Sequence, residues 1–157
     1  MNTFNENTVQ SNQMMKYRDH LNNFYNRYYY DWFVSLNLPD YNVENSEKFL
    51  KTWRCNMTTR DKIQISYLGV IVTSNYTGPH IHLLMFGRNK DGETLLDRNE
   101  RAWEKEWSKI TKCGSYIEPV NDNGVVDYVT RITNTPINHF ELVRPYNKKL
   151  LTKYKMN

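Results

Sequence analysis

Two histidines separated by one residue stand at the start of an apolar segment that is typical of a buried strand. His80 and His82 follow Gly78-Pro79 and lead into Leu83-Leu84-Met85-Phe86. Successive strand side chains point to opposite faces, so both imidazoles share one face while apolar residues occupy both. This pattern predicts a central, covered strand, from which imidazoles are normally absent. The pair could hold a divalent metal ion with a third ligand, or could be hydrogen-bonded histidines at a strand end.

A second candidate for chemistry lies on a helix predicted from Val125 to about Thr133. At about 100° per residue, this helix has a buried apolar stripe that includes Val129 and Ile132. Tyr128 falls at the margin of the stripe, and Arg131 lies beside it on the polar side. A phenol next to a guanidinium could take part in catalysis, whereas a tyrosine at a helix margin is also common as an amphipathic packing residue.

The positive charge of the chain is concentrated at its C-terminus. The net charge is +4, and residues 144–157 contain five cations and no acid. A basic segment interleaved with Tyr146 and Tyr154 suits phosphates and unstacked bases, although a solvated chain end has the same composition. We expect DNA contacts from Arg144, Lys148, Lys149 and Lys153.

The remaining composition indicates one intracellular domain. A chain of 157 residues is long enough for one core. Cys55 and Cys113 match no disulfide, metal or redox spacing. The sequence contains no signal peptide and no apolar segment of transmembrane length, so we expect a soluble cytoplasmic protein without membrane contacts.

Hydrophobic periodicity predicts helices alternating with strands in an α+β fold, with a central antiparallel sheet and packed helices. Predicted helices cover residues 18–30, 46–58, 98–113 (capped by Asp97) and 125–133. Predicted strands cover residues 32–38, 63–73, 79–87 and 115–120, and the second and third form an antiparallel hairpin. We divide the chain into a flexible polar N-terminus (1–16), a single domain (17–143) and a basic tail (144–157).

Three ordered segments together resemble the motifs of the HUH endonucleases, and among these the rolling-circle replication initiators. The segments are Phe33-Val34-Ser35-Leu36-Asn37-Leu38-Pro39, Pro79-His80-Ile81-His82-Leu83-Leu84 and Asp127-Tyr128-Val129-Thr130-Arg131. The resemblance spans residues 31–133. Arg131 stands where the family usually has lysine. The resemblance implies a ferredoxin-like or RRM-like nuclease fold.

The resemblance also implies a mechanism. His80 and His82 would bind Mg²⁺ or Mn²⁺, and Tyr128 would attack single-stranded DNA, leaving a 5′-phosphotyrosine and a free 3′-hydroxyl. Ile132 occupies the position of a second tyrosine, which implies a single nucleophile. The implied partners are single-stranded DNA, such as an origin hairpin, and host replication proteins in the host cell of a virus or plasmid.

The three motifs do not identify the third metal ligand. The family usually takes it from the strand that precedes the histidines, but residues 63–79 contain no Asp or Glu. We expect Glu118 to be this ligand, with Asn37, Asp127, His139 and the oxygen-bearing side chains of residues 63–79 as alternatives.

Two other functions are compatible with the same residues. A single-tyrosine transposase or relaxase would use the same chemistry on different DNA. A non-enzymatic single-stranded nucleic-acid binding module would use exposed aromatics such as Tyr28-Tyr29-Tyr30 and the basic tail. A covalent protein–DNA adduct distinguishes the enzymes from the module.

Overall fold

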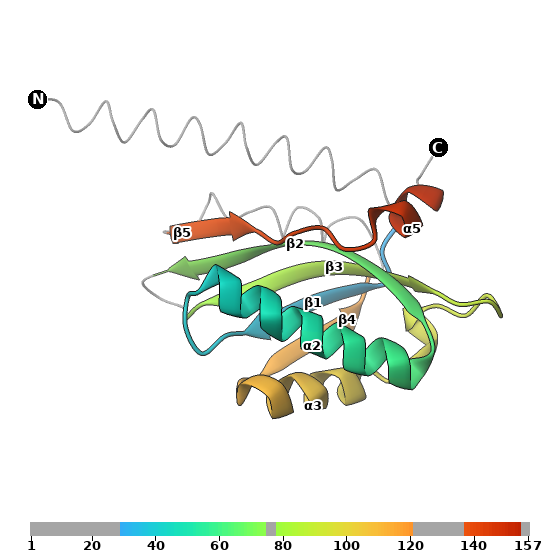
Figure 1. Ribbon diagram of the computed structural model, residues 1–157, viewed down its shortest axis with the longest axis horizontal. Coiled ribbons are helices and arrows are strands. Elements are labelled where there is room, and N and C mark those ends of the chain that lie inside the picture. Colours follow the sequence, from blue (N-terminus) through green and yellow to red (C-terminus); the bar gives the residue numbers. More distant parts are fainter. Residues whose placement is uncertain (1–28, 75–77, 121–136, 155–157) are drawn as a thin grey trace, which may run out of the picture.

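The computed structural model of the protein describes residues 29–74, 78–120 and 137–154. These residues form an α+β fold in which two long helices lie against one face of an antiparallel sheet (Figure 1). The elements, in chain order, are β1 (Trp32–Asn37), α2 (Val43–Asp61), β2 (Gln64–Ser74), β3 (His80–Arg88), the 3-10 helix η1 (Leu95–Asp97), α3 (Glu100–Thr111), β4 (Ser115–Pro119), β5 (Ile137–Leu142) and α5 (Lys148–Lys153).

The histidine-bearing strand is the central one. The four strands β4-β1-β3-β2 form an antiparallel sheet, and β5 lies beside β2 at its edge. Asn37 of β1 is opposite His80, and Ser35 is opposite His82. The predicted α+β class, the antiparallel β2–β3 hairpin and the central position of β3 are therefore confirmed.

The core lies between the sheet and the two helices α2 and α3. Trp53 of α2 contacts Trp103 and Trp107 of α3 in edge-on geometry, with ring centroids 5.4 and 5.8 Å apart. Its indole nitrogen donates to the carbonyl oxygen of Trp103 at 2.9 Å. Trp32 of β1 meets Trp103 at 5.4 Å and links the helices to the sheet. All four indoles are fully buried, so the tryptophans anchor the core.

The opposite face of the sheet is apolar as well. Phe33, Val70, Leu84 and Phe86 are buried there, outside the cluster that packs against α2 and α3. Apolar side chains on both faces of β3 agree with the sequence pattern of a covered strand. The two histidines thus share a face with buried apolar residues.

The predicted start of α3 at Asp97 is wrong. Thr94 caps η1, and the carboxylate of Asp97 accepts a hydrogen bond from the Thr94 amide at 2.8 Å, which completes a capping box. Asn99 then caps α3 by accepting from the Arg101 amide. Because the Asp97 carboxylate caps the turn of η1, helix α3 begins only after the next capping residue, Asn99.

Other elements differ from the predicted boundaries or were not predicted. Helix α2 is longer than residues 46–58, because Asn42 caps it earlier and it ends at Lys62 in the left-handed conformation. Strand β5 and helix α5 were not predicted. The predicted helix at 125–133 lies outside the described residues, as does that at 18–30 except for Tyr29 and Tyr30, which are not helical. Among the described helices, none combines the length and hydropathy needed to cross a bilayer.

Candidate active site

The imidazoles of His80 and His82 converge on one point above the sheet. Their Nε2 atoms are 3.1 Å apart, and the rings stand at 84° to each other. Two ligands at about 2.1 Å from a shared ion are roughly 3.0 Å apart at an octahedral angle and roughly 3.4 Å apart at a tetrahedral one. The pair is therefore spaced to bind one divalent cation with little movement.

The backbone fixes the tautomer of His80. Its Nδ1 lies 2.9 Å from the carbonyl oxygen of Gly78. A carbonyl can only accept, so Nδ1 carries the proton and Nε2 presents a lone pair toward His82. Histidine ligands of metals are commonly oriented by a contact of this kind.

His82 is held neutral. Burial, and secondarily the charge of neighbouring His80, lowers the pKa of His82 to about 3. Its ring is stacked on Phe33, with centroids 5.6 Å apart and planes inclined by 22°. At neutral pH the uncharged ring donates from Nε2 to Nε2 of His80, and binding a metal through that atom would require this proton to move to Nδ1.

Of the described residues directly opposite the histidines, those on β1 bear side-chain oxygen atoms and those on β2 do not. On β2, the residues opposite His80 and His82 are Val72 and Val70. On β1 they are Asn37 and Ser35, whose side chains bear an amide and a hydroxyl. An oxygen ligand from the preceding strand β2 is thus replaced by apolar side chains, and β1 is the strand that can supply one.

The structure does not bring Glu118 to the histidines. Glu118 of β4 is opposite Phe33 of β1, so an entire strand separates it from β3. Its carboxylate accepts a hydrogen bond from the Tyr116 hydroxyl at 3.0 Å. Within the described residues, no group of three His, Cys, Asp or Glu side chains could hold a metal. The prediction of Glu118 as third ligand is corrected accordingly, because strand alternation gave its face but not its distance from β3.

The predicted nucleophile cannot be placed relative to this pair. Tyr128 and Arg131 lie outside the described residues, and so does the alternative ligand Asp127. Their roles remain predictions from the sequence.

The predicted DNA-binding cations lie away from the histidines. Arg144 lines a small pocket with Lys51 and Glu47, and its amide donates to the Glu47 carboxylate at 3.0 Å. The chain then runs back along β2, and Asn147, which caps α5, donates to the carbonyl oxygen of Ile65 near the start of β2. Helix α5, which carries Lys148, Lys149 and Lys153, is therefore near the end of the sheet opposite the histidines (Figure 1).

Sequence reasoning did not single out Tyr116. Its side chain is 56% exposed, and its strand position is opposite Ser35, which is in turn opposite His82. At about 4.8 Å per strand, the Cα atoms of Tyr116 and His82 are roughly 10 Å apart on the same face. Hydrogen bonding to Glu118, reinforced by its charge, raises the pKa of the Tyr116 phenol. The alternation of Tyr116 and Glu118 about buried Ile117 was the available signal.

Comparison of the chain with models of protein families, with curated proteins and with solved structures found no significant match.

Proposed function

We propose that the protein is a metal-assisted endonuclease that nicks and rejoins single-stranded DNA through a tyrosine, as an initiator of rolling-circle replication. The proposal assigns metal binding to His80 and His82, and nucleophilic attack to Tyr128, with Arg131 contacting phosphate. It includes the nuclease fold that the three motifs imply. The observation that supports it best is the 3.1 Å convergence of two imidazole nitrogens on the central strand.

The reaction exchanges one phosphate ester for another. The phenolic oxygen of Tyr128 forms a bond to phosphorus, and the bond from phosphorus to the 3′-oxygen breaks. The phenol gives up its proton and the departing 3′-oxygen takes one, so the products are a 5′-phosphotyrosine and a 3′-hydroxyl. Attack by a 3′-hydroxyl reverses the step and rejoins DNA without another energy source.

The donor set fits a divalent cation through two nitrogens and neutral oxygens. A bound cation would offset the negative charge that develops on the phosphate oxygens. Two neutral imidazoles favour Mn²⁺ over Mg²⁺, which prefers carboxylates and water. Asn37 is opposite His80 on β1, and its side-chain amide could add an oxygen ligand.

The same chemistry would serve a single-tyrosine transposase or relaxase, which differs in the DNA it cuts rather than in the site. A separate candidate is a non-enzymatic single-stranded nucleic-acid binding module. Exposed Tyr116, on the histidine face, favours that function because bases stack on exposed aromatic rings. Tyr30, part of the predicted aromatic platform, does not favour it because its side chain is buried.

The deciding experiment is capture of a covalent adduct. The protein is incubated with Mn²⁺ and a pool of single-stranded oligonucleotides with random central segments, and SDS-resistant adducts are isolated. Peptide mass spectrometry then identifies the modified tyrosine. We expect the adduct on Tyr128, its loss in Tyr128→Phe, and its retention in the matched control Tyr116→Phe.

Two further results separate the candidates. His82→Ala or EDTA should reduce adduct yield by at least about tenfold while the protein stays folded. An adduct on Tyr116 would contradict the assignment of the nucleophile. Binding of oligonucleotides with no adduct under any condition would favour the binding module.

A further inference from the structure

A second polar site lies at the end of β3 opposite the histidines. It is a pocket of about 510 Å³ enclosed by the end of α2, the start of β2, the segment after β3 and helix α5. Its lining includes Lys62, Gln64, Arg88, Lys90, Lys153 and Tyr154. This volume is within the usual range of ligand sites.

The pocket is lined by cations and contains no carboxylate. Lys62, Lys90 and Lys153 are exposed, and none of them forms an ion pair with another described residue. Arg88 is paired with the buried carboxylate of Asp31 at 2.9 Å. The uncompensated charge of the pocket therefore comes from three lysines on three different elements.

Two of the nearby acids are engaged in other contacts, and a third, Asp91 beside Lys90, is not among the lining residues of the pocket. Asp61, adjacent to Lys62, accepts a hydrogen bond from the Trp103 indole at 2.7 Å. Glu93 accepts from Asn89 at 2.8 Å and from Arg98 at 3.2 Å, and these contacts lower the pKa of its carboxyl. Neither carboxylate is among the lining residues of the pocket, so neither is placed to neutralise it.

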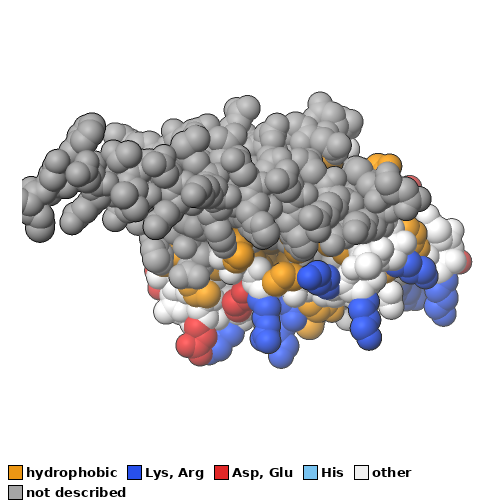
Figure 2. Space-filling model, turned by 90° about the horizontal axis from the view of Figure 1, so that it is seen from above, with side chains coloured by type: hydrophobic (Ala, Val, Ile, Leu, Met, Phe, Trp, Pro, Cys, Tyr) orange, Lys and Arg blue, Asp and Glu red, His pale blue; other side chains and the backbone are white. Residues whose placement is uncertain are grey.

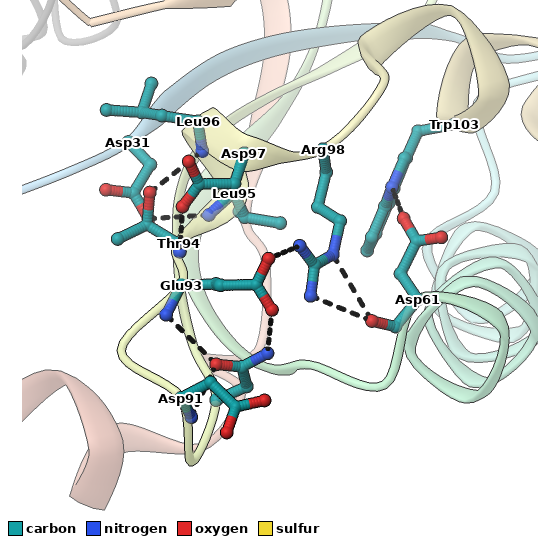
Figure 3. Close-up of polar contacts among 11 residues, drawn as sticks. Asp31, Asp61, Asp91, Glu93, Thr94, Leu95, Leu96, Asp97, Arg98 and Trp103 are labelled. Atoms are coloured by element: carbon teal, nitrogen blue, oxygen red, sulfur yellow. Dashed lines mark hydrogen bonds and ion pairs between the residues drawn. The ribbon is translucent and has the colours of Figure 1, made fainter.

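Figure 3 shows how the segment after β3 is held in place. The side-chain oxygen of Asn89 accepts from the amides of Asp91 and Glu93 at 3.0 Å, which closes the turn that contains Lys90. The guanidinium of Arg98 donates hydrogen bonds to the Glu93 carboxylate and to the backbone carbonyl of Asp61 at the end of α2. The walls carrying Lys62 and Lys90 are thus fixed relative to each other before any ligand binds.

Aromatic rings form the adjoining wall. Tyr154 contacts Phe86 with ring centroids 5.0 Å apart, and the guanidinium of Arg88 lies 4.0 Å from the Phe86 ring and 5.2 Å from that of Tyr154. Tyr154 remains 38% exposed. A cationic pocket beside an exposed ring suits a phosphate and its attached base.

We propose that this pocket binds backbone phosphates of single-stranded DNA. His80 and Arg88 are the first and last residues of β3, so at about 3.3 Å per residue their Cα atoms are roughly 26 Å apart. Arg88 and the histidines project from the same face of β3. Leu84 and Phe86, which lie between them on this face, are buried, so the pocket is a separate contact point for the nucleic acid and not part of one continuous exposed face. The identity of the nucleic acid rests on the proposed function.

The test compares two variants of equal charge. Lys62→Gln/Lys90→Gln/Lys153→Gln removes the pocket lysines, and Lys105→Gln/Lys109→Gln/Lys112→Gln removes three cations from α3 and its C-cap. The variants are matched because Lys62 and Lys112 both end a helix in the left-handed conformation. Binding of fluorescent (dT)16 is measured by anisotropy between 50 and 200 mM salt, with thermal unfolding as a check on folding.

We expect the pocket variant to bind (dT)16 about tenfold or more weakly at low salt, with the slope of log K against log salt reduced by about 2, since each phosphate contact on single strands contributes about 0.7. The α3 variant should bind within about twofold of wild type. Equal losses in both variants, or no binding by wild type, would overturn the inference. If the pocket variant binds (dT)16 like wild type while the adduct on Tyr128 still forms, the pocket inference fails and the proposed function stands. If the pocket variant loses binding while wild type forms no adduct, the pocket inference stands and the proposed function fails.

Discussion

At the scale of single residues, the histidine pair combines a fixed tautomer with a neutral partner. His80 is oriented by the Gly78 carbonyl, and burial keeps His82 uncharged. The site differs from a typical Mg²⁺ centre because no described carboxylate joins it. Its affinity for a cation should therefore depend on the neutral oxygens of β1.

This arrangement predicts opposite effects for two substitutions at one position. Asn37→Asp should raise Mn²⁺ affinity by about tenfold, because it places an anionic oxygen beside His80, and Asn37→Ala should lower it. Glu118→Gln should leave it unchanged, because β1 lies between Glu118 and the histidines. Isothermal titration with Mn²⁺ measures all three, and a large loss in Glu118→Gln would restore Glu118 as the ligand.

At the scale of elements, the approach of β2 to β3 positions His82. Gly69 of β2 is opposite Leu83. A Cβ atom at Gly69 would overlap the carbonyl oxygen of His82 and lie 2.6 Å from Leu83 Cδ2. The absence of a side chain at Gly69 therefore allows the two strands to pair at the histidines.

Gly69→Ala should lower the free energy of unfolding by about 2–3 kcal/mol, since backbone must move to relieve the overlap. Gly78→Ala is the matched control, because a Cβ at Gly78 meets nothing within 4 Å. Urea unfolding followed by circular dichroism compares the two. Equal stability of the variants would show that the strands adjust without cost.

Helix α2 is joined to the sheet by a buried phenol. Tyr67 is 1% exposed, and its hydroxyl lies 2.8 Å from Nη1 of Arg54. Burial, only partly opposed by Arg54, raises the pKa of Tyr67 to about 12. The phenol oxygen accepts from the guanidinium of Arg54, and it is burial that favours the neutral form.

Stability should therefore fall as pH rises from about 10 to about 12. The unfolded phenol loses its proton near pH 10, whereas the folded one retains it, so the unfolded state binds fewer protons across this window. The contribution of Tyr67 to this loss is at most about 3 kcal/mol. Unfolding measured at pH 9 to 12 should show a flatter decline in Tyr67→Phe than in wild type, and parallel curves would contradict the assignment.

At the scale of the whole molecule, the basic C-terminal segment is part of the fold. Val143 and Leu151 are buried, and Tyr146 stacks on Tyr67 with centroids 5.5 Å apart. Figure 2 shows Lys and Arg side chains on the part of the surface that is described, and the burial of each residue shows that Arg144, Lys148, Lys149 and Lys153 of this segment are exposed. The segment predicted as a tail thus contributes both packing and surface charge.

Truncation after Leu142 should consequently reduce the melting temperature by roughly 10 °C or more, because it removes at least two buried apolar side chains. The control Lys149→Gln removes an exposed charge and should melt within about 2 °C of wild type. Thermal unfolding by circular dichroism measures both. A truncated chain with the wild-type melting temperature would show that the segment does not stabilise the domain.

The sequence by itself determined the α+β class, the hairpin and the shared face of the two histidines, because strand and helix periodicities are local properties of the chain. It also predicted the tryptophan-bearing helices, although it misassigned the cap of α3. Short β5 and α5 lack enough residues to show a period. Their places depend on contacts with β2, which is distant in the sequence.

Only the tertiary structure decided which residues meet across strands. It placed Asn37 and Ser35 beside the histidines, moved Glu118 away from them, and assembled Lys62, Lys90 and Lys153 around one pocket. Strand order and register set these distances, and both arise from packing of the whole sheet rather than from any one segment.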